Sequence, residues 1–298
     1  MSTAHTDNDV PQEYESYYVP AQSKWPIMGA LALYLIAMGL GLTVSGLSSR
    51  NGTWLLFVGF GLIIFMLIGW FRDVISESMS GLYSHQLDRS FRQGMNWFIF
   101  SEVMFFAVLF GVLFYARFIS VPWLGGASNN VMTAAVLWPE FIPEWPLIKT
   151  PDGHETTAIS AWGLPLMNTV ILLTSSITIY IAQVALVKGN RNYLIVFLLL
   201  TVLLGWIFLF FQGEEYTYAY QEINLRIDSG IYGSTFFLLT GFHSVHVFLG
   251  SIILFIVWLR VLKGHMTSNH HFAIQAGSLY WHFVDIVWLF LFMFVYIL

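Results

Sequence analysis

Two ionisable residues lie inside a long apolar stretch near the end of the chain. His282 and Asp285 are three residues apart in the run Tyr280–Phe290, which is otherwise aromatic and aliphatic. Residues at this spacing share one face of a helix, and ionisable groups inside a membrane-spanning segment are costly enough to suggest a function. The alternative is structural, with each side chain satisfying the other or a neighbouring helix. The spacing alone favours the structural interpretation.

A carboxyl group also lies in an apolar run, at Glu102 within Ser101–Phe106. It is eight residues into the third predicted helix, roughly 12 Å from that helix's cytoplasmic end at 1.5 Å per residue. Such a group either exchanges protons or stays protonated and hydrogen-bonded to a neighbouring helix. The residue pattern leaves both interpretations open.

His243 and His246 have the i, i+3 spacing that metal and haem sites also use. Because they lie on one helix face, they cannot ligate both sides of one haem, and a cofactor would need a partner such as His282. Hydrogen bonding between helices is therefore the favoured interpretation. Another group of basic residues indicates a solvated rim at a membrane end rather than a metal site. It consists of Arg260, Lys263, His265, His270 and His271.

Composition assigns the protein to the polytopic membrane class. Hydrophobic residues make up 57% of the 298 residues and charged residues 10%, against roughly 25% charged in a soluble globular domain. The 27 Phe, 14 Tyr and 12 Trp suit apolar helices with aromatic belts at the membrane surfaces. The absence of cysteine excludes disulfides, thiolate nucleophiles and iron–sulfur clusters. A net charge of −5 does not indicate a nucleic-acid partner.

Seven apolar segments are each long enough to cross a hydrocarbon core of ~30 Å. They are Pro26–Leu47, Trp54–Phe71, Gly94–Phe118, Gly163–Val187, Tyr193–Phe211, Gly230–Leu259 and Phe272–Leu298. The sequence therefore predicts an all-α protein with seven transmembrane helices after a cytoplasmic tail, residues 1–25. The proline-rich segment Ile119–Trp162 predicts a surface loop. The charged segment Arg72–Arg92 allows a gap between the first two helices and the other five.

The distribution of lysine and arginine predicts the orientation, because these residues are enriched in cytoplasmic connections. Eight of them fall in the N-terminal tail and the even-numbered connections: Lys24, Arg72, Arg89, Arg92, Lys188, Arg191, Arg260 and Lys263. The other side has four: Arg50, Arg117, Lys149 and Arg226. The N-terminus is therefore expected in the cytoplasm and the C-terminus outside.

Several motifs occur in a specific order along the chain. They are Trp70–Val74, Phe100–Phe106, Leu164–Thr169, Asp228–Phe237, Thr240–Val247, Thr267–Phe272 and Tyr280–Trp288. Together they resemble subunit III of the haem–copper cytochrome c oxidases, over nearly the whole chain from about Tyr17 to Leu298. The segment Tyr17–Pro26 and the long third connection resemble bacterial members, which implies a bacterial cytoplasmic membrane.

The resemblance implies a non-catalytic core subunit of a proton-pumping oxidase that reduces oxygen to water. Haems and coppers would belong to subunits I and II, and this chain would hold no redox cofactor and no metal. Its implied roles are to stabilise subunit I, to hold phospholipids in a cleft between helices one–two and three–seven, and to support proton uptake. The implied proton-uptake group, reactive toward carbodiimide, is Glu102. The implied lipid-binding residues are Trp70, Arg72, Glu77, His85, Phe98 and Arg260, and the buried structural polar residues are His243, His246, His282 and Asp285.

Two positions depart from the family pattern, and three alternative functions stay open. Ser76 stands where mitochondrial members carry a cleft arginine, and Gly111 replaces a tryptophan, so the detailed lipid contacts are in doubt. A quinol oxidase subunit III is the alternative within the family, although such relatives usually have five helices and lack the glutamate of helix three. A proton-coupled transporter would use Glu102, Asp285 and the histidines as a relay. A di-histidine membrane cytochrome is the third alternative.

Overall fold

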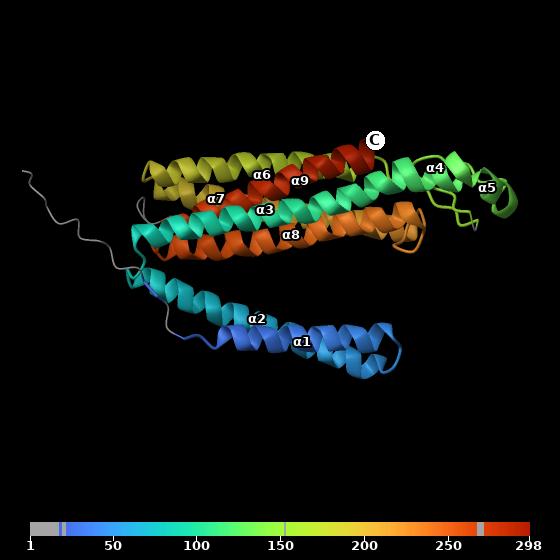
Figure 1. The fold of residues 1–298 in the computed structure, drawn as a ribbon. Helices are drawn as coiled ribbons and strands as arrows, with labels where there is room; N and C mark the ends of the chain where they lie inside the picture. The colour runs from blue at the N-terminus through green and yellow to red at the C-terminus, as the bar shows by residue number, and fades with distance from the viewer. Residues whose placement is uncertain (1–17, 20–21, 152, 267–270) are drawn as a thin grey trace, which may run out of the picture. The chain divides into compact units, whose positions relative to one another are not determined.

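Seven long helices form the framework of the protein (Figure 1). The structure is a computed structural model that describes residues 18–19, 22–151, 153–266 and 271–298. The seven helices are α1 (Trp25–Val44), α2 (Ser49–Met79), α3 (His85–Tyr115), α6 (Leu164–Val187), α7 (Arg191–Gln221), α8 (Ile231–Leu262) and α9 (Phe272–Leu291). Each is long and apolar enough to cross a membrane. The predicted all-α, seven-helix class is confirmed.

Several helix boundaries differ from those predicted by hydropathy, and α2 extends beyond both ends of the predicted segment Trp54–Phe71. Helix α3 begins at His85 rather than Gly94, and α7 continues to Gln221 rather than ending at Phe211. The reason is that Arg, Glu and Gln are good helix formers, so a helix continues through polar residues where an apolar pattern stops. The predicted loop after α3 is wrong over its first part, which forms short helices. These are η1 (Ala116–Ser120), α4 (Val121–Leu124), η2 (Ser128–Asn130) and α5 (Val131–Leu137).

The chain divides into two compact units, residues 1–91 and 92–298. The division follows α2 and the first turns of α3, as expected for two helices and five. The tail prediction for residues 1–25 falls mostly on positions outside the described residues, as does the motif segment 267–270. The lipid cleft stays a prediction, and each unit is described by itself.

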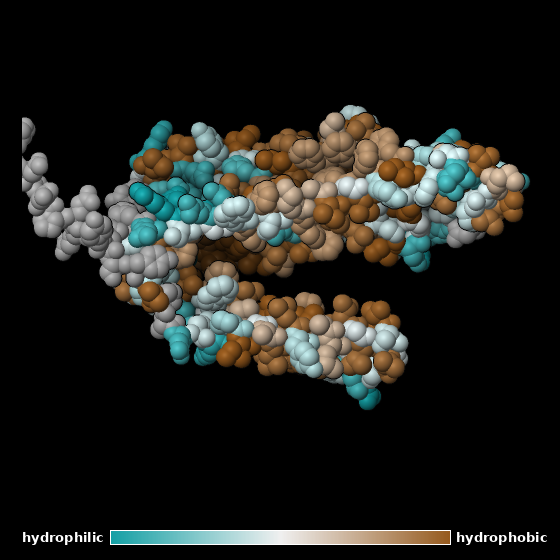
Figure 2. All heavy atoms as spheres, viewed as in Figure 1, coloured by the Kyte–Doolittle hydropathy of each residue, from teal (hydrophilic) through white to brown (hydrophobic). Residues whose placement is uncertain are grey.

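In the first unit, α1 and α2 pack through their smallest residues. Apart from Trp25, the buried positions of the two helices are Ala32, Gly39, Gly52 and Gly59, spaced seven residues apart within each helix. A methyl group added at Gly39 would lie 2.8 Å from the Gly52 carbonyl oxygen. Close backbone approach at small residues is a common means of association for membrane helices. Large apolar side chains instead cover the outside of this unit (Figure 2).

Trp25 closes one end of this helical hairpin. Its indole N–H donates to Asp73 Oδ2 at 2.7 Å, and its ring lies over Gly69, where an added Cβ would approach within 2.0 Å. The hydrogen bond satisfies the single donor of a tryptophan that is only 8% exposed.

In the second unit, α6, α7, α8 and α9 form a ring in which each helix packs against the next. Two tryptophans of α9 fill its centre, and both are fully buried. Trp281 Nε1 donates to Ser175 Oγ at 2.9 Å, and Trp288 Nε1 donates to Thr169 Oγ1 at 3.0 Å. These bonds fix the register of α9 against α6, because each indole reaches one hydroxyl.

Helix α3 attaches to this ring through aromatic side chains. The Phe105 ring meets Phe242 of α8 edge to face at 5.0 Å, and the Phe106 ring lies 6.1 Å from Phe283 of α9. Phe106 is 2% exposed. The same turn of α3 carries Glu102, so these ring contacts place the carboxyl group against α8.

Candidate functional site

Glu102 and His246 form an ionisable pair that joins α3 to α8. Glu102 Oε2 lies 2.9 Å from His246 Nε2, and the two side chains are 22% and 13% exposed. The other ring nitrogen, His246 Nδ1, lies 2.7 Å from the carbonyl oxygen of Phe242. A carbonyl oxygen only accepts hydrogen bonds, so Nδ1 carries a proton.

This assignment of Nδ1 defines the chemistry of the pair. If His246 is neutral, its Nε2 is an acceptor and Glu102 must donate as a carboxylic acid. If His246 is the imidazolium ion, Nε2 donates to a Glu102 carboxylate. One proton is therefore shared along the Oε2–Nε2 hydrogen bond, and the pair has no net charge in either state. Such a pair can accept or release a proton, as the expectation for Glu102 requires.

Aromatic rings surround the pair. The Phe105 and Tyr280 rings are stacked against the His246 imidazole at 6.1 and 6.4 Å, and the Phe106 ring meets it edge to face at 5.1 Å. The Tyr280 hydroxyl donates to the His246 carbonyl oxygen at 3.4 Å. Apolar ring faces lower the local dielectric and strengthen the Glu102–His246 hydrogen bond.

The predicted position of Glu102 along its helix was wrong. Because α3 begins at His85, Glu102 lies seventeen residues from the start of the helix, which is about 26 Å at 1.5 Å per residue. The first helical turns carry Arg89 and Arg92, which the hydropathy pattern assigned to a connection. The carboxyl group is thus near the middle of α3.

The other three polar residues predicted to be buried lie on α8 and α9. His243 and Asp285 are buried, but the prediction is wrong for His282, whose side chain is 35% exposed. His243 is 0% exposed, and its Nε2 lies 3.2 Å from the Val284 carbonyl oxygen of α9. His282 Nδ1 is 2.7 Å from Ser176 Oγ of α6. Both contacts are interhelical hydrogen bonds, as the structural interpretation expects.

His282 and Asp285 do not satisfy one another. His282 Nδ1 lies 4.0 Å from Asp285 Oδ2, beyond hydrogen-bonding distance. Neither carboxyl oxygen of Asp285 has a hydrogen-bond partner among the described residues, although the residue is only 5% exposed. Of the two structural alternatives, mutual pairing or a partner on a neighbouring helix, the second applies to His282, whose hydrogen-bond partner is Ser176 of α6.

Four of the proposed lipid-binding residues belong to the first unit. Trp70 and Arg72 are exposed on α2, and the Tyr83 hydroxyl donates to Glu77 Oε2 at 3.0 Å. Burial, and then the neighbouring Glu77, raise the pKa of the Tyr83 phenol above its ordinary value. Tyr83 therefore remains a donor at neutral pH. Of His85, the structure describes only its place at the start of α3.

The other two proposed lipid-binding residues belong to the second unit. Phe98 is stacked on Tyr280 with ring centroids 6.1 Å apart. Arg260 lies in the last turn of α8, partly buried, and its Nε has no hydrogen-bond partner among the described residues. Phe98 is exposed, whereas Nε of Arg260 is buried.

The two positions that depart from the family pattern, Gly111 and Ser76, both have free space around them. A Cβ at Gly111 would have no atom within 4 Å, and this glycine borders an apolar cavity of about 440 Å³ with Phe114, Phe118 and Phe294. Ser76 is exposed on α2.

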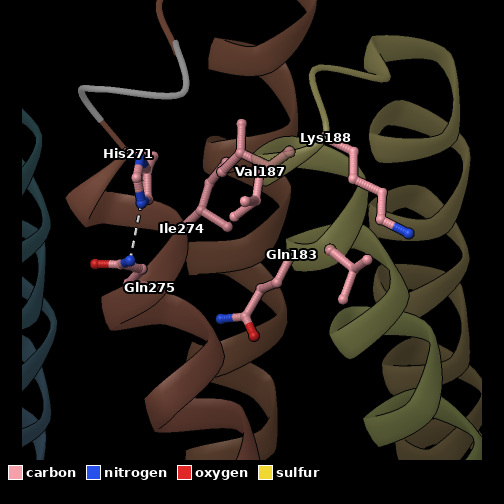
Figure 3. Close-up of a pocket in the computed structure, with 8 residues that line it drawn as sticks. Gln183, Val187, Lys188, His271, Ile274 and Gln275 are labelled. Carbon is pink, nitrogen blue, oxygen red and sulfur yellow. Dashed lines mark hydrogen bonds between the residues drawn. The ribbon is translucent and has the colours of Figure 1, made fainter.

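A pocket of about 300 Å³ lies at the end of the second unit where α6 ends and α9 begins. Figure 3 shows Lys188 and His271 on opposite sides of it, with His271 Nε2 2.8 Å from Gln275 Nε2. Gln275 Oε1 also accepts from Arg92. The solvated cationic rim predicted at Arg260, Lys263, His265, His270 and His271 stays a prediction, and His270 lies outside the described residues.

Within the described parts of the chain, no three His, Asp or Glu side chains gather closely enough to hold a metal ion. The expectation that the chain binds no metal and no haem stays a prediction. The sequence did not predict four further buried side chains with polar groups: Asn168, Gln212, Glu215 and Tyr296. Gln212 and Glu215 were missed because the predicted fifth helix ended at Phe211.

Comparison with known proteins agrees with these features. The family described as Cytochrome c oxidase subunit III matches residues 15–298. The chain is 37% identical over 282 residues to cytochrome c oxidase subunit 3 of Gazella subgutturosa, covering 94% of this chain and 96% of that protein. It is 38% identical, with the same coverage, to the subunits 3 of Antilope cervicapra and Felis catus. The chain therefore belongs to the cytochrome c oxidase subunit III family.

Proposed function

We propose that this chain is a non-catalytic core subunit that supports proton uptake by a proton-pumping cytochrome c oxidase. The observation that carries the proposal is the Glu102–His246 pair, whose Oε2 and Nε2 atoms lie 2.9 Å apart, with three aromatic rings against the imidazole. Family membership places the chain in an oxidase complex. The pair can therefore take up a proton in the membrane while oxygen chemistry takes place in another subunit.

The Glu102→Gln substitution tests this role. Glutamine keeps the shape of the side chain, and its NH₂ group can still donate to His246 Nε2, but it cannot exchange the shared proton. We expect the oxidase to assemble and its initial oxygen reduction to remain within about twofold of wild type, a change below 1 kcal/mol in barrier height. Proton uptake should slow, turnover should end earlier, and carbodiimide labelling of this chain should disappear.

A matched control is Glu214→Gln, which removes a carboxyl group from α7 and leaves the pair intact. Labelling should persist in that variant. Immediate loss of nearly all oxygen reduction in a fully assembled Glu102→Gln oxidase would contradict the supporting role, because it would make Glu102 essential to the chemistry.

The proposed partners are subunits I and II, which would carry the haems and coppers. The interhelical hydrogen bonds of His243 to a backbone carbonyl and of His282 to a serine support a structural role for these two histidines. A haem absorption band in the purified chain, freed of its partners, would refute the assignment.

Bound phospholipid is the second proposed role, with Arg72 and Arg260 as phosphate ligands in their respective units. A guanidinium can bind two oxygens of one phosphate, and Arg260 lies in the last turn of α8. Replacing both arginines by alanine should reduce tightly bound phospholipid in the purified oxidase by at least half and shorten its working life. The measurement is native mass spectrometry. The control is Arg50→Ala at the other end of α2, and equal lipid content in all three proteins would refute the assignment.

The proposed location is a bacterial cytoplasmic membrane, with the N-terminus inside and the C-terminus outside. The eight-to-four division of basic residues supports this orientation. Reporter fusions near Lys188 and after Leu298 distinguish it from the reverse, because only the second should be active in the periplasm.

A further inference from the structure

A second group of buried polar side chains lies inside the second unit and does not include Glu102 or His246. It comprises Asn168, Gln212, Glu215 and Tyr296, which are 0%, 2%, 1% and 8% exposed. The Tyr296 hydroxyl donates to Glu215 Oε1 at 2.7 Å. The Gln212 side chain lies beside the same hydroxyl but outside hydrogen-bonding geometry.

The helix register brings Asn168 to the same level as Gln212. Thr178 of α6 and Thr201 of α7 share a hydrogen bond of 2.8 Å, and the two helices are antiparallel neighbours joined by a short turn (Figure 1). Asn168 and Gln212 lie ten and eleven residues beyond that pair in the same direction, so their levels differ by about one helical rise of 1.5 Å. Both side chains are buried within this unit.

A π-helical segment brings Tyr296 into this group. Trp281 and Trp288 are seven residues apart and face the centre of the ring, so a regular α-helix would present Val295 there next. Residues Phe292–Ile297 instead form a π-helix, which adds one residue to the turn. Tyr296 is consequently the buried residue, and Val295 is only partly buried. Such π-helical turns are frequent at functional sites.

Five polar atoms of this group have no hydrogen-bond partner within the described structure. They are both amide atoms of Asn168, both amide atoms of Gln212, and Glu215 Oε2. Three of these atoms are acceptors and two are NH₂ donors. Buried polar atoms in proteins are nearly always paired, with protein or with ordered water.

We propose that Asn168, Gln212, Glu215 and Tyr296 form an internal binding site for a cluster of ordered water molecules. Water both donates and accepts, and a buried water typically makes about three hydrogen bonds. It therefore satisfies the amide NH₂ groups as well as the oxygens. A metal cation would bind only the oxygens and leave two NH₂ donors unpaired. The site is independent of the role proposed for Glu102.

Cryo-electron microscopy of the complete oxidase, at a resolution that shows ordered water, tests this proposal together with metal analysis. We expect at least two water densities, each within hydrogen-bonding distance of two of the four side chains. A single density bound only by oxygens, with one equivalent of metal, would overturn the proposal. Direct hydrogen bonds among the four side chains, with no density between them, would also overturn it.

A variant provides a second measurement. Asn168→Leu with Gln212→Met removes four of the five unpaired atoms at nearly constant volume and keeps the Tyr296–Glu215 bond. The water densities should disappear in this variant, while carbodiimide labelling at Glu102 stays within about twofold of wild type. Persistence of the same densities would refute the assignment. If the variant does not assemble, the wild-type map and its metal content decide the question.

Discussion

The Gly39→Leu substitution is expected to separate α1 from α2 and to remove most of the first unit's stability. A Cβ at this position would lie 2.8 Å from the Gly52 carbonyl oxygen and 2.8 Å from the Leu56 amide nitrogen. Both are backbone atoms, so no side-chain rotation can relieve the clash. Overpacking costs about 1–3 kcal/mol where neighbours can move, and the cost here should reach the upper end or exceed it.

The measurement is the fraction of the chain retained in the purified oxidase, combined with limited proteolysis. The Gly39→Leu variant should lose the subunit or become sensitive to cleavage between α1 and α2. Gly41→Leu is the matched control in the same helix, because a Cβ there has no atom within 4 Å. The two substitutions change helix propensity equally, so identical retention and cleavage in both would show that the glycine contact does not hold the hairpin together.

The helices could be predicted from sequence because the membrane imposes a simple rule on them. A segment of about twenty apolar residues must be helical in order to pair its own backbone groups. Hydropathy therefore located all seven helices but not their ends. The ends of α3 and α7 carry Arg89, Arg92 and Glu215, which are compatible with a helix though not with an apolar pattern.

The pairing of Glu102 with His246 could not be predicted from sequence in the same way. The two residues are 144 positions apart, and their contact depends on the rotation of α3 against α8. That rotation is determined by ring contacts such as Phe105 with Phe242. Residue types indicated that each group needed an interhelical partner, but not which partner.

Spacing along the sequence also could not identify every partner or every buried side chain. The i, i+3 spacing of His282 and Asp285 left open whether they satisfy one another or a neighbouring helix, and Ser176 of α6 is the closer partner of His282. Tyr296 was missed because a π-helical turn moves it onto the buried face. Periodicity arguments assume 3.6 residues per turn, and one added residue changes which side chain is buried.

The second large effect is expected from Gly205→Val in α7, at the centre of the four-helix ring. A Cβ at Gly205 would lie 2.5 Å from Ser251 Oγ and 2.6 Å from the indole of Trp281. The indole cannot move aside, because its Nε1 donates to Ser175 at 2.9 Å. A Cβ at Gly250 would already lie 3.0 Å from the same ring, so there is no room on that side either.

Gly205→Val should therefore disrupt the packing of the second unit and lower its stability by on the order of 3 kcal/mol or more. We expect the amount of this chain in the purified oxidase to fall at least tenfold. Gly213→Val is the matched control in the same helix, because a Cβ at Gly213 has no atom within 4 Å. This control variant should remain near wild-type abundance and should keep carbodiimide labelling at Glu102.

A compensating substitution separates steric overlap from any other effect of valine at this position. Trp281→Leu removes the indole that Gly205 contacts, and alone it should be destabilising by about 3–5 kcal/mol because it leaves a cavity. When Trp281→Leu is combined with Gly205→Val, the valine fills part of that cavity. The double variant should therefore be more abundant than the sum of the two single losses predicts. Strict additivity of the two losses would show that Gly205 and Trp281 do not limit one another, and the packing account of this ring would then be wrong.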